Sequence, residues 1–461
     1  MSALWTSDEI AKAVGGEAQG DFVANGVAFD SREVGADDLF IALKGGTTDG
    51  HRFIDGAFGN GAAGAIVSVD CAHPHVRVAD TTAALDALGT ASRARTDAKI
   101  VGVTGSVGKT GTKEALFAAL DRSAEGRVHR SVKSYNNHTG VPLSLARMPA
   151  ASRYGVFEMG MNHAGELAAL TRIVRPHVAM ITAIAPAHIE FFDSIEGIAD
   201  AKGEIFRGLE PGGIALVPFD SPHRDRLIGW AEPYAETIWT FGREDGADIR
   251  AAEVVSSIAG TMVSAVLPDG ELTYTIGLPG DHWVSNSLAV IGAVEAVGGD
   301  LAAAGLALAE LAGLPGRGAR SAITLEAGEA LLIDESYNAN PLSMKAALKT
   351  LAEEPVDRRI AVLGAMGELG DDAERYHAEL AGPIVDAGIA FAILVGAPMQ
   401  VLADALGKTI SIVHVPDADA ALANLEGKIR AGDAVLVKGS NYIGLARLVE
   451  ALAGGKTLCS T

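Results

Sequence analysis

The stretch from Lys99 to Leu120 constrains the fold of this chain more than any other. An apolar segment, residues 100–103, runs into a glycine-rich turn, and an apolar helix is expected to begin at Lys109. A strand, a glycine turn and a helix start together aim backbone N–H groups and the positive end of a helix dipole at one point. The stretch therefore predicts a nucleoside triphosphate site, whose loop is Thr104, Gly105, Ser106, Val107, Gly108, Lys109 and Thr110.

Two side chains of this loop carry distinct chemistry. The Lys109 ammonium can reach the outer phosphates, and the Thr110 hydroxyl is placed to ligate Mg²⁺. Position 103 is Val, so the loop is a shorter form of the strict phosphate-loop motif. An apolar strand at residues 154–157 ends in Glu158. An acid at the carboxyl end of such a strand is where a second Mg²⁺ contact is expected, the alternative being a surface carboxylate.

Composition narrows the class of protein. The chain has 461 residues, and at roughly 100 to 200 residues per domain this predicts about three domains. A net charge of −21 argues against a nucleic-acid binder. Cys71 and Cys459 are too few and too far apart for a disulfide framework. No apolar run of about 18 residues occurs, and Asp8 and Glu9 stand where a signal peptide would be basic, so we expect a cytoplasmic protein without membrane insertion.

The chain reads as three α/β parts, 1–97, 98–312 and 313–461. In the first, Ser31, Arg32, Lys44 and His51 lie near turns and form a modest candidate site for an anionic substrate. In the second, residues 234–276 read as short antiparallel segments. In the third, strands are expected at 331–333, 360–363, 391–395, 410–413 and 434–437, and helices near 341–352, 374–387, 417–429 and 442–453. This alternation is the pattern of a Rossmann-like parallel sheet. The part lacks a G-x-G-x-x-G turn, which disfavours dinucleotide binding.

Three further residues stay open on local pattern alone. His188 follows a strand and is either a ligand or a core imidazole. Lys202 reads as a lysine on a helix surface. Arg317, in a Pro-Gly-Arg-Gly linker, is either a phosphate clamp that acts when domains close or an ordinary surface arginine.

A series of motifs along nearly the whole chain resembles one family. The motifs are Asp30-Ser31-Arg32, Asp49-Gly50-His51, the phosphate loop, Tyr135-Asn136-Asn137, Glu158-Met159-Gly160, His188, Lys202-Gly203-Glu204, Gly316-Arg317, Tyr337-Asn338-Ala339-Asn340-Pro341 and Lys438-Gly439-Ser440. In this order they resemble the Mur ligases of peptidoglycan synthesis. The Tyr-Asn-Ala-Asn-Pro motif is the most discriminating, because sister ligases usually show Tyr-Ala-His there.

The resemblance implies an α/β, three-domain Mur ligase architecture. It comprises an N-terminal domain for the UDP end of the substrate, a central P-loop ATPase domain and a C-terminal Rossmann-like domain. The branch it resembles most joins D-Ala-D-Ala to UDP-MurNAc-tripeptide through an acyl phosphate, giving ADP and phosphate. A monomer is expected.

The resemblance also implies roles for individual residues. It places two Mg²⁺ ions on Thr110, Glu158, His188 and Lys202, with Lys202 carbamylated so that it offers an anionic oxygen. Lys109, Lys202, His188 and Arg317 are the implied catalytic residues. Beyond the phosphate loop, the implied ATP contacts are Asn286, Arg317, Asp334 and Asn338. The implied substrate contacts are Ser31, Arg32, Asp49, His51, Asn136 and Asn137.

Some features depart from the family pattern, and rival functions remain. Trp283 replaces an asparagine, Ala365 an aspartate, and Gly111 a threonine. One alternative is another amide ligase, either a sister Mur ligase or a folylpolyglutamate-type enzyme. Another is a nucleotide-switched binding protein of the P-loop kind, which would lack a second substrate site.

Overall fold

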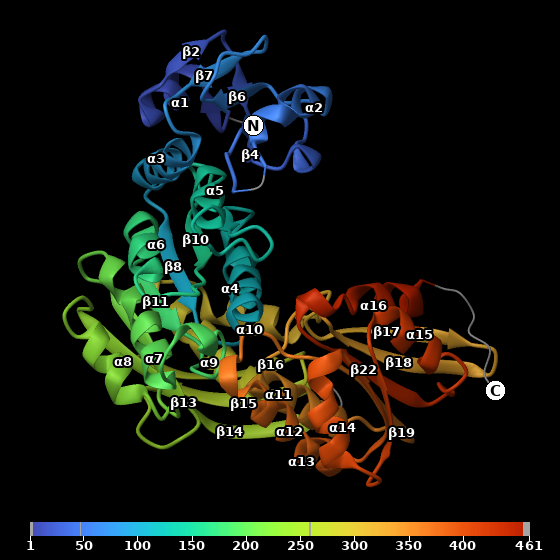
Figure 1. Ribbon diagram of the computed structural model, residues 1–461. Coiled ribbons are helices and arrows are strands. Elements are labelled where there is room, and N and C mark those ends of the chain that lie inside the picture. Colours follow the sequence, from blue (N-terminus) through green and yellow to red (C-terminus); the bar gives the residue numbers. More distant parts are fainter. Residues whose placement is uncertain (1–2, 47, 258–259, 455–461) are drawn as a thin grey trace.

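The computed structural model describes residues 3–46, 48–257 and 260–454, so Cys459 lies outside the described residues. The described chain forms three sheet-based bodies, an N-terminal, a central and a C-terminal one, and Figure 1 shows them arranged as an L. The central body occupies the corner. Among the described residues, no helix combines the length and apolarity needed to cross a bilayer.

The N-terminal body is a five-stranded sheet with strand order β2-β7-β6-β5-β4. Its strands are β2 (Glu17–Gln19), β4 (Gly26–Ala28), β5 (Asp38–Ile41), β6 (Gly64–Val67) and β7 (His75–Arg77). A short pair, β1 (Trp5–Thr6) and β3 (Val23–Ala24), lies beside it. Its helices are α1 (Ser7–Val14), α2 (Ile54–Gly59) and α3 (Thr81–Ala94). The Trp5 indole donates to the Ala146 carbonyl at 2.8 Å, which ties this body to the central one.

The central body is a nine-stranded sheet with order β16-β15-β14-β13-β12-β11-β8-β10-β9. Its strands are β8 (Lys99–Thr104), β9 (Val128–Arg130), β10 (Tyr154–Glu158), β11 (Val178–Ile181), β12 (Ile214–Pro218), β13 (Thr237–Gly242), β14 (Ile249–Ser257), β15 (Gly260–Leu267) and β16 (Gly270–Ile276). The antiparallel prediction for 234–276 is wrong for β13, which pairs in parallel with β12 and β14. It is right for β14 to β16.

Helices cover both faces of the central sheet. One face is covered by α4 (Lys109–Ala124), α9 (His282–Ala296) and α10 (Leu301–Ala309). The other is covered by α5 (Gly140–Ala146), α6 (Glu166–Val174), α7 (Ile195–Gly203) and α8 (Arg224–Ala231). In β8, Val101 and Val103 pack in the first core and Ile100 in the second. Alternate side chains of a strand point to opposite faces, so an unbroken apolar strand is what a sheet covered on both sides needs.

The C-terminal body is a six-stranded sheet with order β17-β18-β22-β19-β20-β21. Its strands are β17 (Ala319–Leu325), β18 (Gly328–Glu335), β19 (Arg358–Gly364), β20 (Ile389–Val395), β21 (Ser411–Val415) and β22 (Asp433–Lys438). Its helices are α11 (Pro341–Ala352), α12 (Ala373–Ala378), α13 (Ala381–Asp386), α14 (Gln400–Leu406), α15 (Ala418–Leu425) and α16 (Ala446–Ala453). Only β17 is antiparallel to its neighbour, so the Rossmann-like prediction is confirmed for the other five strands.

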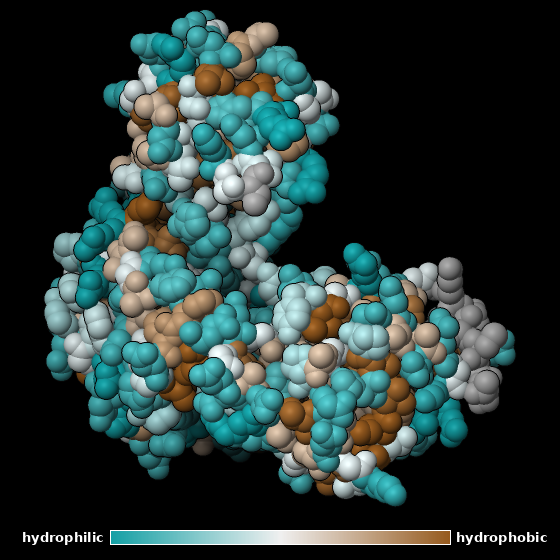
Figure 2. Space-filling view, viewed as in Figure 1, coloured by the Kyte–Doolittle hydropathy of each residue, from teal (hydrophilic) through white to brown (hydrophobic). Residues whose placement is uncertain are grey.

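The N-terminal and C-terminal bodies stand apart. Figure 2 shows open space between them above the central body, so the inner flanks of both are accessible to solvent in this arrangement. The C-terminal body instead touches the central body directly, where the Lys349 ammonium lies 2.5 Å from the Asp281 carboxylate. The central and C-terminal bodies can therefore share one site.

A partly buried histidine makes the stability of the central body depend on pH. Burial lowers the pKa of His129 from its usual 6.5 to about 4, although its Nε2–H donates to the Ser144 carbonyl at 2.7 Å. Between pH 6.5 and 4 the unfolded chain binds a proton that the folded chain does not, so stability falls as the pH drops through this window. The full loss is about 3 kcal/mol at 1.36 kcal/mol per pKa unit.

We therefore expect His129→Gln, which stays neutral, to lose less thermal stability than the wild type between pH 7 and pH 5. Thermal melts at the two pH values measure this. His163→Gln serves as the control, because the His163 side chain is 61% exposed. An equal loss in the wild type and in His129→Gln would contradict the assignment.

Candidate functional site

The predicted phosphate loop joins the end of β8 to the start of α4. Gly105 and Gly108 have φ angles of 152° and 83°, which favour glycine. A Cβ atom at Gly105 would also collide with the Thr182 hydroxyl. Gly108 is the N-cap of α4, and no side chain caps this helix. The first N–H groups of α4 are therefore left for an anion, as the sequence predicts.

A cavity of 690 Å³ opens in front of this loop and is lined by both the central and the C-terminal bodies. It brings together many of the predicted residues, namely Ser106, Val107, Gly108, Lys109, Thr110, Asn136, Glu158, His188, Asn286, Arg317 and Asn338. Residues from at least four separate segments thus converge on one space. That convergence is what a two-substrate site on a phosphate loop requires.

The Glu158 carboxylate lies at the floor of this cavity and is 1% exposed, so it is no surface carboxylate. The Thr110 hydroxyl donates to its Oε2 at 2.9 Å, and the Asn136 amide donates to its Oε1 at 2.8 Å. A hydroxyl beside a carboxylate at the end of a phosphate loop is an oxygen donor set that suits Mg²⁺, which binds through one or two carboxylates plus phosphate oxygens. Thr110 and Glu158 therefore fit the ion that the resemblance implies.

Two lysines of the predicted site, Lys109 and Lys202, have lowered pKa values, and of these two Lys109 alone lines the cavity. Burial lowers the pKa of Lys109, opposed by the charge of Glu158, and its ammonium donates to the Gly105 carbonyl at 2.7 Å. Burial and the positive charge of Lys109 put the pKa of Lys202 well below its usual range. Lys202 is 1% exposed, so the prediction of a surface lysine is wrong. Lys202 lies near the C-terminal end of α7, where Ile198 and Ala201 are buried as well.

His188 contacts the C-terminal body. Its Nδ1 lies 2.5 Å from Oε2 of Glu368. Both residues have left-handed backbones, with φ of 60° and 59°. Since His188 also lines the cavity, it is not a core imidazole. Because Nδ1 faces a carboxylate, Nε2 is the nitrogen left to serve as a ligand, since metal-binding histidines usually direct their other ring nitrogen to such a group.

The linker and the C-terminal body contribute Arg317 and Asn338 to the cavity. The Arg317 guanidinium stacks over Tyr337 at 4.1 Å and reaches the Ser134 hydroxyl at 3.4 Å. Asp334, by contrast, does not line the cavity. It accepts hydrogen bonds from the Gly316 N–H at 2.6 Å and from Ser336, so it fixes the turn that carries Arg317.

Two of the departures from the family pattern touch each other. A Cβ atom at Gly111 would lie 3.1 Å from Cη2 of Trp283, and both residues line the cavity. The Trp283 indole therefore packs against the first turn of α4. A side chain larger than that of glycine at position 111 would crowd the indole.

The candidate substrate residues of the N-terminal body lie outside this cavity. The Arg32 side chain is 86% exposed and pairs with Asp30. His51 Nδ1 lies 2.6 Å from the Asp49 carboxylate, and its Nε2 accepts from the Ser68 N–H. Ser31 belongs to the same short helical turn as Arg32. Asn137, in the central body, also lies outside the cavity; its side-chain oxygen accepts from the Gly140 N–H just before α5.

Among the charged residues around the site that the sequence reading missed are Lys113 and Glu368, together with Asp220, Arg320 and Glu335, which line the cavity. Lys113 is fully buried on α4. A signal for it exists, because position 113 falls on the helix stripe that continues through Leu116 and Leu120. Glu368 could not be found in this way, since its partner His188 belongs to another domain.

Glu158 offers a direct test of the proposed metal contact. We expect Glu158→Gln, which keeps the shape but removes the charge, to raise the Mg²⁺ concentration needed for half-maximal ATP consumption by about tenfold or more, as losing one charge-assisted contact would. Titrating Mg²⁺ at saturating ATP measures this. Glu125→Gln, at the far end of α4, is the control. An unchanged Mg²⁺ requirement would exclude Glu158 as a ligand.

The comparisons with known proteins agree with this geometry. Three family models match in succession: "Mur ligase family, catalytic domain" over residues 23–95, "Mur ligase middle domain" over 103–294 and "Mur ligase, glutamate ligase domain" over 320–441. A crystal structure of MurF from Acinetobacter baumannii superposes with a TM-score of 0.85 at 30% identity, covering 98% of this chain and 99% of that one. The MurF ligase of Thermotoga maritima in complex with ADP gives 0.75 at 27% identity, covering 93% and 97%.

Curated relatives extend along nearly the whole sequence. A protein of Escherichia coli (strain K12) is 35% identical over 454 residues, which are 97% of this chain and 98% of the relative. One of Rickettsia prowazekii is 32% identical over 452 residues, 97% and 99% of the two chains. Both are named UDP-N-acetylmuramoyl-tripeptide--D-alanyl-D-alanine ligase. With this similarity, three matching family models in the expected order and a phosphate loop that opens on a shared interdomain cavity, the chain belongs to the Mur ligase family.

Proposed function

We propose that this protein is the ATP-dependent ligase that joins D-Ala-D-Ala to UDP-MurNAc-tripeptide, giving UDP-MurNAc-pentapeptide, ADP and phosphate. The observation that carries the proposal is the cavity in which Lys109, Glu158 and Arg317 converge from separate parts of a chain similar to such ligases. We assign residues 1–97 to the UDP end of the substrate, 98–312 to ATP and 313–461 to closing the site. We also propose that it works as a monomer in the cytoplasm.

The first chemical step activates a poor acylating group. An oxygen of the tripeptide carboxylate attacks the γ-phosphorus of ATP, the bond from that phosphorus to the β,γ-bridging oxygen breaks, and ADP leaves. Two anions must meet for this to happen, and the Lys109 ammonium lies where it can lower their repulsion. We propose that Arg317, which is held by Tyr337 and by the turn on Asp334, also contacts the phosphate.

In this proposal Thr110 and Glu158 hold one Mg²⁺, and His188 and Lys202 hold a second. Bound Mg²⁺ supplies charge neutralisation at the phosphate oxygens. An ammonium cannot ligate a cation, so Lys202 serves only as a carbamate, formed when its amine adds to CO₂ and loses a proton. The lowered pKa of Lys202 supports this, because the neutral amine is the form that reacts.

The second step forms the amide. The amine of D-Ala-D-Ala attacks the acyl carbon, a tetrahedral intermediate collapses, and phosphate leaves with the oxygen that it received. Water would compete with the amine for the acyl phosphate. A site shared between the central and C-terminal bodies can exclude water when the two close on the substrates.

Phosphate release tests the proposed function. We expect release from ATP to require both UDP-MurNAc-tripeptide and D-Ala-D-Ala, with UDP-MurNAc-pentapeptide identified by mass. Release without either substrate would favour a nucleotide switch instead. Release with a different amine or acid in place of these two would favour the alternative of another amide ligase.

A further inference from the structure

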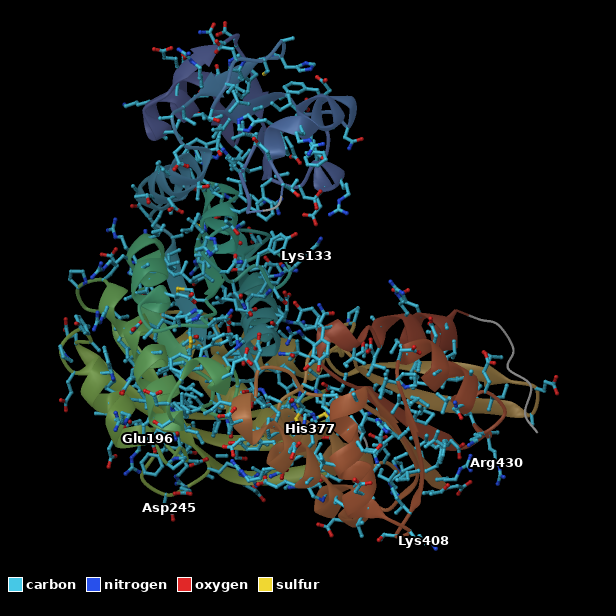
Figure 3. The ribbon with its side chains drawn as sticks, in the orientation of Figure 1. Lys133, Glu196, Asp245, His377, Lys408 and Arg430 are labelled. Carbon is cyan, nitrogen blue, oxygen red and sulfur yellow. The ribbon has the colours of Figure 1, made fainter. Side chains whose placement is uncertain are left out.

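The segment Ser131–Asn136, called the junction segment below, contacts all three parts of the chain. Towards the N-terminal body, the Lys133 ammonium lies 2.5 Å from Glu33 Oε1 and the Tyr135 hydroxyl donates to the same carboxylate at 3.0 Å. Figure 3 shows Lys133 directly below that body. Towards the C-terminal side, Ser134 meets the Arg317 guanidinium. This stretch of six residues in the central body therefore contacts Glu33 of the N-terminal body and Arg317 of the linker to the C-terminal body.

The same segment also holds the carboxylate at the floor of the cavity. The Asn136 amide donates to Glu158 Oε1 at 2.8 Å, and the Glu158 N–H donates to the Ser131 hydroxyl at 3.0 Å. A side chain at position 160 would crowd this amide, because a Cβ atom on Gly160 would lie 2.7 Å from the Asn136 side-chain oxygen. Any displacement of the junction segment is therefore passed to Glu158.

A buried cation anchors the segment from below. The Lys113 ammonium donates to the Lys133 carbonyl at 2.6 Å and to the Ser131 carbonyl at 3.2 Å. It also lies 2.9 Å from Glu114 and 3.9 Å from Glu158. The Lys113 side chain is fully buried. Burying a lysine is costly compared with an apolar residue of the same length, so its place on the apolar side of α4 needs a compensating role.

The backbone of the segment is strained at the point that Lys113 holds. Lys133 has a φ of 51°, in the left-handed region that a lysine rarely adopts. Such a conformation persists only where the surroundings impose it. The bond from Lys113 to the Lys133 carbonyl lies at this residue, whose side chain is the one that pairs with Glu33.

We propose that Lys113 is a positioning residue that, through the junction segment, links occupancy of the N-terminal body to the placement of Glu158. The Glu33 carboxylate belongs to the same short turn as Ser31 and Arg32, the proposed substrate residues, so a substrate bound there acts on Lys133 and Tyr135. The inference rests on the proposed function for the identity of that substrate. Because such linkage is reciprocal, the UDP-substrate and the nucleotide strengthen each other's binding.

Calorimetry without turnover tests the linkage. The dissociation constant of ADP with Mg²⁺ is measured in the presence and absence of UDP-MurNAc-tripeptide. In the wild type we expect the tripeptide to tighten ADP binding by about tenfold, a typical coupling factor, and in Lys113→Met by less than about twofold. Lys99→Met, an exposed lysine on β8 of the same sheet, is the matched control and keeps the wild-type ratio.

Two surface variants keep the test decisive if Lys113→Met does not fold. Lys133→Ala and Glu33→Gln remove opposite ends of one ion pair, so each is expected to lower the coupling ratio and the double variant to lower it no further. A Lys113→Met protein that loses thermal stability but keeps the wild-type ratio would overturn the proposal, as would a wild type with a ratio of one. If the wild type makes pentapeptide yet shows either result, the proposed function stands and only this inference fails.

Discussion

Replacing Lys109 with alanine is expected to lower kcat for phosphate release by about 10³-fold, the upper range for losing one preorganised charge in a closed site. Lys109 is a partly buried residue of the phosphate loop, where desolvation lowers its pKa and the charge of Glu158 opposes that shift. Among the described residues, Lys438 is the other lysine that lines the cavity, and it belongs to the C-terminal body. A steady-state assay with both substrates measures the loss.

Comparing the change in kcat with the change in KM for ATP tells whether Lys109 acts in the chemical step or only in binding. In the proposed mechanism Lys109 contacts phosphates whose charge develops further in the transition state, so kcat is expected to fall more than the affinity for ATP. Lys99→Ala is the control, because Lys99 begins the same strand but is exposed. A Lys109→Ala enzyme with a raised KM for ATP and an unchanged kcat would show that the residue only binds.

Lys202→Ala is expected to lower turnover by about 10² to 10³-fold, as for a lost electrostatic group in the site. Lys202 is buried, and burial lowers its pKa. The positive charge of Lys109 lowers that pKa further. If it acts as a carbamate, formate or acetate added to the alanine variant restores part of the activity. Labelling with ¹³C-bicarbonate also gives a carbamate carbon signal by NMR in the wild type that the variant lacks.

Lys202→Arg distinguishes the carbamate from a simple cation. A guanidinium keeps the positive charge but does not add to CO₂, so this variant is expected to be as inactive as Lys202→Ala. Activity in Lys202→Arg would mean that the positive charge itself is used. Wild-type turnover in Lys202→Ala would remove the residue from the mechanism.

Sequence prediction worked where the determinant is local. The phosphate loop is one contiguous stretch, and its glycines, its lysine and the following helix are adjacent in the chain, so its conformation follows from short-range sterics and the helix dipole. The strands of the C-terminal sheet were predicted for the same reason, because their apolar runs are themselves the signal for burial on both faces. β17 was missed, since an edge strand buries only Ile323 and Leu325 fully and lacks such a run.

The break between α12 and α13 was not predicted from the apolar periodicity of the sequence. A single helix over 374–387 was predicted, but the chain forms α12 and α13 with a break between them. Pro383 lies one turn after the break and has no N–H to donate to the preceding turn. The apolar periodicity continues across the break, through Tyr376, Leu380 and Ile384, so it does not indicate where one helix ends and the next begins.

The sequence by itself determined that residues 104–110 would form a glycine-rich turn between a strand and a helix and that Glu158 would end the neighbouring strand. Only the tertiary structure decided that Lys202 is buried, that His188 meets Glu368 and that Lys113 reaches the junction segment. Each of these depends on segments brought together by packing from distant parts of the chain. The ionisation and the partner of a charged side chain are set by everything that surrounds it, whereas a loop's shape is set mainly by its own residues.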